Sequence, residues 1–215
     1  MELVSINVSL PREIVHNNKH IQTSIYKKPV AGEIAVGHSN LAGDRQSDLK
    51  NHGGEHKAVY GFSASHYHFW REKLNNPDIV YGQFGENLTI TDLDETSLCI
   101  GDQLQIADCI LEITQPRVPC FKLGIAFDLN TMPDLFIQHA ATGIYFRVIQ
   151  TGTINTGNTV ERIRQHPAKL SVHTLFKAYF DKQFTNSEAV MHHALTIPEL
   201  STEWHQKVLS RVNRT

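Results

Sequence analysis

The chain has 215 residues, of which 40% are hydrophobic and 20% charged, as in a globular protein with a buried core. Lysines and arginines number 20 against 22 aspartates and glutamates, so the net charge of -2 provides no general attraction for nucleic acid or an anionic membrane surface. The N-terminus lacks a secretory signal pattern and no apolar stretch is long enough to span a membrane, so we expect a cytoplasmic protein.

The first two thirds of the chain are predicted to form short strands joined by turns. Aromatic residues at helical spacing predict one helix over 65–74, before Asn75-Asn76-Pro77. Many short strands with few helices favour a mostly β fold, with a β-barrel-like domain over 1–163. Alternating apolar and polar residues indicate strands over 2–9, 32–36, 57–62, 87–90, 103–106, 110–114 and 143–151.

The pattern changes after His166-Pro167. Apolar residues at helical spacing predict helices over 171–180, 187–195 and 198–212. We therefore expect a small C-terminal α-helical bundle over 164–215. Its apolar stripes are expected to pack on the barrel or on a second subunit, and a homodimer is the expectation.

Three cysteines, Cys99, Cys109 and Cys120, lack the short spacing of a zinc knuckle or a redox pair. In a reducing compartment they are expected to stay free thiols, of which at most one needs a function. Cys120 is the candidate, because prolines stiffen the segment 115–120 and the nearby Arg117 and Lys122 favour a thiolate. The alternative at this stage is a buried, inert cysteine.

Two polar segments could bind an anion. In the first, Gly53 and Gly54 permit a tight backbone turn, and the flanking His52 and Lys57 add donors for a phosphate. A polar hairpin loop is the alternative, and a zinc site at His52 and His56 is disfavoured because the glycines oppose a helix. The second segment, 23–29, offers a hydroxyl and two ammonium groups from Ser24, Lys27 and Lys28.

A third segment, 82–89, has Gly82 and Gly85 framing a turn before a strand. Glu86 and Asn87 then offer a carboxylate and an amide at the start of that strand. Taken alone, this pattern is also typical of an ordinary turn. The sequence contains no Walker loop, dinucleotide-binding fingerprint or serine nucleophile elbow, which excludes the common nucleotide-binding and hydrolase motifs.

Taken together and in order, these motifs resemble a MOSC domain of the YiiM type. The resemblance covers roughly residues 24–160, and the C-terminal helices are similar to the three-helix appendage of YiiM-like proteins. Glu55 stands where proline is common, and Ile144 where tryptophan is frequent. The residues that carry the resemblance are Asp44 with Asp48, His52-Gly53-Gly54, Lys57-Ala58-Val59-Tyr60, Phe84-Gly85-Glu86-Asn87-Leu88-Thr89, Ile100-Gly101-Asp102, Gln115-Pro116-Arg117 and Pro119-Cys120.

The resemblance implies a domain that binds molybdenum cofactor (molybdopterin), with Cys120 as the thiolate ligand to molybdenum. It implies relatives that reduce N-hydroxylated compounds, including hydroxylamino purine analogues, and it associates the chain with pyridoxal phosphate binding. Electrons would come from a separate reductase, because no flavin or haem motif is visible. Glu86, Asn87 and Asp48 are the candidates for proton delivery or pterin hydrogen bonds. The candidates for binding the phosphorylated pterin are Ser24, Lys27, Lys28, His52, Gly53, Gly54, Lys57, Arg117 and Arg147.

Two other functions remain open. The chain could be a non-catalytic carrier that stores the cofactor or moves sulfur through a persulfide on Cys120. It could also be a binding module in which Cys120 is structural. Neither a nucleic-acid nor a membrane partner is expected from the composition.

Overall fold

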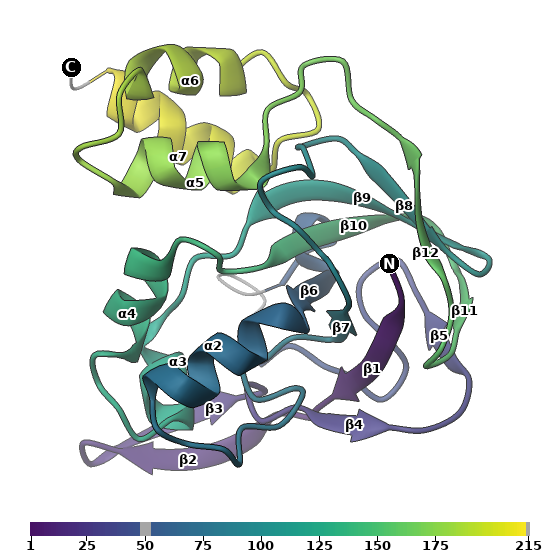
Figure 1. Cartoon of the computed structure of the whole chain (residues 1–215). Helices are drawn as coiled ribbons and strands as arrows, with labels where there is room; N and C mark the ends of the chain where they lie inside the picture. The colour runs from purple at the N-terminus through teal and green to yellow at the C-terminus, as the bar shows by residue number, and fades with distance from the viewer. Residues whose placement is uncertain (48–52, 214–215) are drawn as a thin grey trace.

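The computed structural model describes residues 1–47 and 53–213. Its centre is an eight-stranded mixed sheet in the order β12-β8-β9-β10-β6-β7-β1-β4 (Figure 1). The pair β6 and β7 is parallel, and the other neighbours in this sheet are antiparallel. The sheet strands are β1 (Leu3–Val8), β4 (Lys28–Val30), β6 (Val59–Ser63), β7 (Leu88–Ile90), β8 (Gln103–Ile106), β9 (Cys109–Pro116), β10 (Ile144–Gln150) and β12 (Val160–Arg164).

The sheet curls so that its two ends approach each other. The amide of Leu3 donates to the Asn158 carbonyl at 3.0 Å, and the amide of Val160 donates to the Met1 carbonyl at 2.9 Å, which joins the start of β1 to the start of β12. Two smaller sheets flank this body. They pair β2 (Arg12–His16) with β3 (Lys19–Thr23), and β5 (Ile34–Val36) with β11 (Gly152–Ile154).

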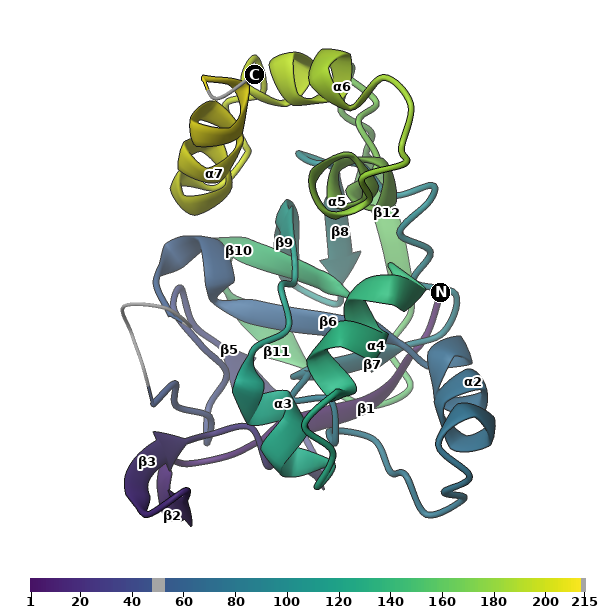
Figure 2. The same cartoon turned by 90° about the vertical axis from the view of Figure 1, so that its left-hand side faces the viewer.

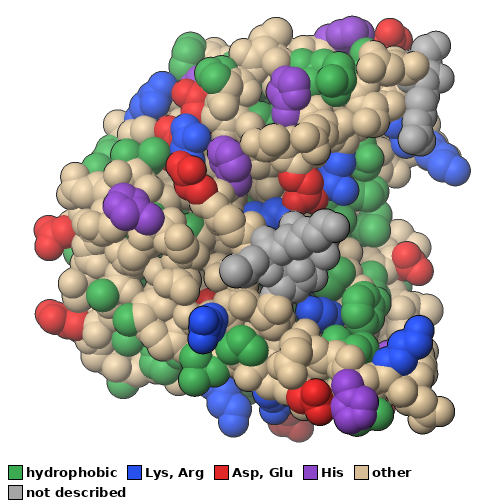
Figure 3. Space-filling model, turned by 180° about the vertical axis from the view of Figure 1, so that it is seen from behind, with side chains coloured by type: hydrophobic (Ala, Val, Ile, Leu, Met, Phe, Trp, Pro, Cys, Tyr) green, Lys and Arg blue, Asp and Glu red, His purple; other side chains and the backbone are tan. Residues whose placement is uncertain are grey.

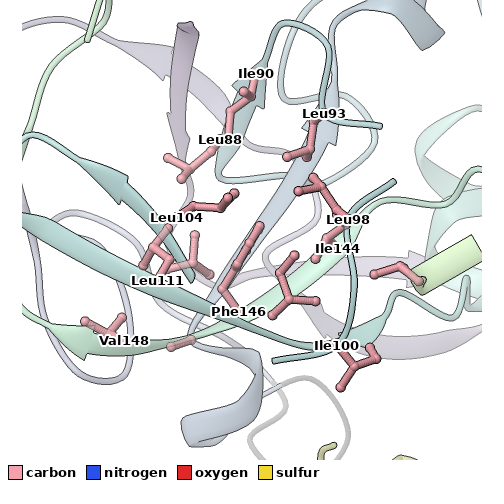
Figure 4. Close-up of a cluster of buried hydrophobic side chains, with 14 of the residues drawn as sticks. Leu88, Ile90, Leu93, Leu98, Ile100, Leu104, Leu111, Ile144, Phe146 and Val148 are labelled. Carbon is pink, nitrogen blue, oxygen red and sulfur yellow. The ribbon is translucent and has the colours of Figure 1, made fainter. Parts of the chain in front are cut away.

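The curled sheet encloses the main hydrophobic core. Leu88, Leu111 and Phe146 come from three different strands and are fully or almost fully buried (Figure 4). Alternation along β10 explains part of this core, because Ile144, Phe146 and Val148 are buried at every second position.

A second, aromatic cluster fills the space beneath the helices near the middle of the chain. Phe62, Trp70, Phe84 and Phe136 are all fully buried in it. The Phe62 and Phe84 rings lie 4.8 Å apart, and Trp70 stacks on Phe136 at 5.1 Å. The helices that cover it are α2 (Ser65–Lys73), α3 (Phe121–Ala126) and α4 (Met132–His139).

The C-terminal residues form three helices that gather at one end of the molecule (Figures 1 and 2). Serine hydroxyls cap two of them, because Ser171 accepts from the Thr174 amide and Ser201 from the Trp204 amide, each at 3.1 Å. The Ser201 amide also donates to the Thr114 carbonyl of β9 at 3.1 Å, which ties the last helix to the sheet. The helices are α5 (Val172–Phe180), α6 (Ser187–Ala194) and α7 (Thr202–Val212).

The predicted strands and helices are found close to their expected places, and the fold is more helical than the sequence indicates. The sequence analysis missed α3 and α4, the hairpin of β2 and β3, and the strands β4, β11 and β12. Both helices are short, so the apolar residues that pack against the aromatic cluster recur over too few turns to indicate a helix. The main core runs from the sheet into α5 to α7, so the division at residue 163 stays a prediction. No helix in the described part of the chain is long and apolar enough to cross a membrane.

Candidate functional site

One pocket brings together segments that lie far apart in the sequence. It is lined by Ser24 and Lys27 after β3, by Lys57 at the end of the short 3-10 helix η1 (Glu55–Lys57), and by Asn87, Arg117 and Cys120. These six are all residues that the sequence analysis proposed for the site. Seen from behind, lysine and arginine side chains lie around a hollow in this face of the molecule (Figure 3).

Cys120 stands at the end of the proline-rich segment that leaves β9. Its backbone is extended, and its carbonyl accepts from the Leu123 amide at 2.9 Å at the start of α3. The side chain is partly exposed, whereas Cys99 and Cys109 are buried. The proline-rich segment therefore turns this thiol into the pocket rather than into the core.

Arg117 is the most deeply buried cation of the pocket, with 5% of its surface exposed. Its guanidinium lies over the rings of Tyr60 and Phe136, at 5.4 and 5.2 Å from their centres. Nη2 donates to the Phe84 carbonyl at 3.5 Å, and Nη1 has no hydrogen-bond partner within the described residues. A buried guanidinium nitrogen without a partner is costly, which favours an anionic or polar ligand at this point.

Another wall of the pocket holds a row of hydrogen-bonded polar side chains, Lys27, Asp44 and Asn87. Lys27 Nζ lies 2.5 Å from Asp44 Oδ1, and Asn87 Nδ2 donates to Asp44 Oδ2 at 2.9 Å. Asn87 Oδ1 in turn accepts from the Tyr60 amide at 3.1 Å. Burial lowers the pKa of Lys27, and the Asp44 carboxylate opposes that shift.

Further polar groups complete the lining. Ser24 Oγ has no hydrogen-bond partner among residues 1–47 and 53–213, although the atom is buried. Lys122 reaches in from α3, and its Nζ donates to the Gln22 carbonyl at 2.9 Å. Tyr145 lies nearby on β10, and burial raises the pKa of its hydroxyl to about 12, so the phenol stays neutral.

The glycine pair acts through the backbone rather than by lining the pocket. Gly54 has φ of 92°, which favours glycine, and its carbonyl accepts from the Lys57 amide at 3.0 Å. This turn brings Lys57 to the pocket. Gly53 and Gly54 are not among the described residues that line the pocket, so direct cofactor contacts from them stay a prediction.

Glu86 is fully buried and is not among the residues that line the pocket, so its part in proton delivery stays a prediction. Its Oε1 accepts from the Gly82 amide at 2.7 Å and from Thr89 Oγ1 at 2.9 Å, and it also accepts from the Tyr67 hydroxyl. Burial raises the pKa of this carboxyl. Glu86 therefore holds the turn together, while the next residue, Asn87, faces the pocket.

Two cations that were predicted to bind the cofactor, Arg147 and Lys28, do not line the pocket. Arg147 pairs with Glu112, which stands directly opposite it on β9, and it is not among the residues that line the pocket. Lys28 is exposed on the edge strand β4, since the chain alternates there and only Lys27 turns inward. Asp48 and His52 lie outside the described residues.

The sequence analysis did not assign Asp44, Tyr60 and Tyr145 to the site, and it named Lys122 only as a neighbour of the thiol. Asp44 and Tyr60 belong to the motifs quoted for the resemblance, so the sequence could have indicated that they are part of the site. The described residues contain no group of three or more His, Cys, Asp or Glu that could hold a metal ion. A metal in this pocket would therefore rely on Cys120 and on donors supplied by its own cofactor.

The family model described as "MOSC domain" matches residues 48–161. The chain belongs to the MOSC domain family. Over 214 residues this MOSC chain is 34% identical to "Uncharacterized protein YflK" of Bacillus subtilis (strain 168), and the match covers 99% of the chain and 95% of that protein. Over 155 residues it is 34% identical to a protein named "Reductase" from Gibberella moniliformis, and it spans 71% of the chain but 28% of the fungal protein.

A solved structure extends the likeness to the whole MOSC chain. The crystal structure of YiiM from Geobacillus stearothermophilus matches with a TM-score of 0.82 at 29% identity, covering 98% of each chain. The chain is thus a MOSC protein of the YiiM type, as the resemblance predicts. The match includes the helical C-terminal region as well as the sheet.

Proposed function

We propose that this MOSC protein binds molybdenum cofactor in the pocket and reduces N-hydroxylated compounds to amines. The observation that carries the proposal is the partly exposed Cys120 in a pocket that Arg117 and Lys57 also line. A thiolate is the soft donor that suits a sulfur-ligated molybdenum ion, which would supply the redox chemistry when bound. The fungal relative named "Reductase" supports the assignment to redox chemistry.

The lining suits a phosphorylated pterin. Arg117 Nη1 and Ser24 Oγ are buried polar atoms that lack a partner within the described residues, and both residues face the pocket. A phosphate would accept from both groups and from Lys57, and charge-assisted hydrogen bonds of this kind are strong. Asn87 and the neutral Tyr145 hydroxyl would orient polar atoms of the bound molecules. Pyridoxal phosphate carries the same kind of phosphate, so the pterin content of the native protein is needed to separate the two.

The reaction needs electrons and protons from outside the pocket. Reducing R-NHOH to R-NH2 and water consumes two electrons and two protons, and we infer that a separate reductase supplies the electrons. Tyr145 keeps its proton at neutral pH because its pKa is raised to about 12, so it can donate a hydrogen bond to the oxygen that leaves as water.

The test compares Cys120→Ser with Cys109→Ala, both produced in a host that makes molybdenum cofactor. We expect wild type and Cys109→Ala to convert a hydroxylamino purine to the amine with a chemical electron donor, and Cys120→Ser to lose at least about 100-fold in rate, because the metal loses its protein ligand. Full activity in Cys120→Ser would remove the thiol from the mechanism. Labelled sulfur on Cys120 without any turnover would favour the sulfur or cofactor carrier instead.

A further inference from the structure

Lys122 is a buried cation at the pocket wall that the proposed function does not use. It belongs to α3, is 8% exposed and lines the same pocket as Cys120. Its Nζ donates to the Gln22 carbonyl of β3 at 2.9 Å, and within the described part of the chain it forms no ion pair with a carboxylate. An ammonium group has three N–H donors, so one neutral carbonyl leaves two donors and the positive charge uncompensated.

The other two lysines that line the pocket have carboxylate partners. Lys27 pairs with Asp44, which is the one acidic residue among the described lining residues. Lys57 pairs with Glu203 in the first turn of α7. Lys122 therefore differs from both, because the protein supplies its charge with no anion of its own.

Arg117 is the other lining cation without a carboxylate partner among the residues that the structure describes. Its guanidinium lies over the Tyr60 and Phe136 rings and donates to the Phe84 carbonyl, whereas Lys122 faces β3. The two cations thus have separate neighbours. Two buried positive charges of this kind suit a set of ligands with two anionic groups.

We propose that Lys122 binds a phosphate group of the substrate, so that the preferred substrates are phosphorylated N-hydroxylated compounds, such as a hydroxylamino purine nucleotide. The phosphate of the cofactor is assigned to Arg117, which leaves the second charge for the substrate. A lysine is a point charge that suits phosphate, whereas bidentate recognition of a carboxylate favours arginine. Turnover of such a substrate rests on the proposed function, and recognition of its phosphate rests on Lys122.

A neutral substrate should bind less tightly, because it leaves the buried ammonium group without an anion. The test compares hydroxylamino purine riboside with its 5′-monophosphate. Both are titrated by calorimetry, without an electron donor, into the full chain purified from a host that makes molybdenum cofactor. We expect wild type to bind the monophosphate about tenfold more tightly than the riboside, as for one hydrogen-bonded charge.

Two variants locate this preference in the pocket. Lys122→Gln should bind the two compounds equally, since glutamine can still donate to the Gln22 carbonyl but carries no charge. Lys28→Gln is the matched control, because it removes the same charge from an exposed position on the edge strand β4. It should keep the tenfold preference of wild type.

Equal affinity of wild type for the riboside and the monophosphate, including no binding of either, would overturn the proposal. The same preference in Lys122→Gln and Lys28→Gln would also overturn it. The molybdenum content of the same samples reports on the proposed function separately. Protein without molybdenum would contradict that function, while a phosphate preference that is lost only in Lys122→Gln would still support the anion subsite.

Discussion

The two cysteines near the ends of β9 have opposite environments. Cys109 begins the strand, is 1% exposed and packs in the main core, where burial raises the pKa of its thiol to about 12. Cys120 follows the end of the same strand and lines the pocket with Arg117 and Lys57. The comparison teaches that the surroundings, and not the cysteine itself, decide which thiol is available for chemistry.

The prolines at the end of β9 and before Cys120 create this difference. Pro116 is the last residue of β9, and Pro119 precedes the thiol. The Arg117 amide still donates to the Gly143 carbonyl at 3.0 Å, and Pro119, which lacks an amide donor, cannot extend the pairing further. The chain leaves the sheet there, and Cys120 reaches the pocket at the start of α3.

Thiol alkylation should give the largest contrast between the two ends of the strand. At neutral pH we expect iodoacetamide to modify Cys120 about 100-fold faster than Cys109, since Cys109 is sealed and stays protonated. Peptide mass spectrometry over time measures both rates in one sample. In guanidinium chloride the two rates should converge, and equal rates in the native protein would break the comparison.

Substituting Arg117 tests the anion site beside Cys120. Arg117→Gln should weaken phosphate binding about tenfold, because the pocket loses its most buried positive charge. Arg211→Gln is a matched control, since Arg211 also lies over a tyrosine ring, Tyr179, at 5.7 Å but on the exposed surface of α7. Calorimetric titration measures both variants, and the same loss in both would contradict a local role for Arg117.

Substituting Glu86 should have the smallest effect of these changes, and only on the free energy of unfolding. Burial raises its pKa above the ordinary 4.5, so the folded protein binds this proton more tightly than the unfolded chain. Its contribution to the free energy of unfolding is fully present below pH 4.5 and is lost as the pH rises through the raised pKa. Glu86→Gln should flatten this pH dependence and shift the free energy of unfolding by about 1 kcal/mol or less near pH 4.5, since glutamine keeps the accepting oxygen.

Denaturant titrations at a series of pH values test the Glu86 prediction. The exposed Glu161 on β12 provides the control, and Glu161→Gln should leave the wild-type pH profile unchanged. A profile that stays the same in Glu86→Gln would contradict the assignment of the raised pKa to this carboxyl.

Much of the fold could be predicted because the strands show clear alternation. The expected strand over 143–151 is β10, and the helix over 65–74 is α2. The short helices α3 and α4 could not be predicted, since the contacts that hold them come from distant parts of the chain. Leu123 and Phe136 gain their burial from the aromatic cluster and not from a long helical pattern of their own.

The site was predictable where a motif sets the direction of its side chain. Cys120 and Arg117 lie in one stiff segment, and both line the pocket. The sequence could not separate Glu86 from Asn87, because neighbouring residues at the start of a strand face opposite sides and the pattern does not say which side is the pocket. Glu203 was invisible from the sequence, as no local pattern links α7 to Lys57.

The molybdenum content of the native protein tests the central claim most directly. Wild type and Cys109→Ala, purified from a host that makes the cofactor, should each contain molybdenum and pterin at about one per chain, and Cys120→Ser should contain neither. Elemental analysis with pterin fluorescence on the three proteins measures this. Wild-type protein without molybdenum, or Cys120→Ser loaded to the same level as wild type, would contradict the account.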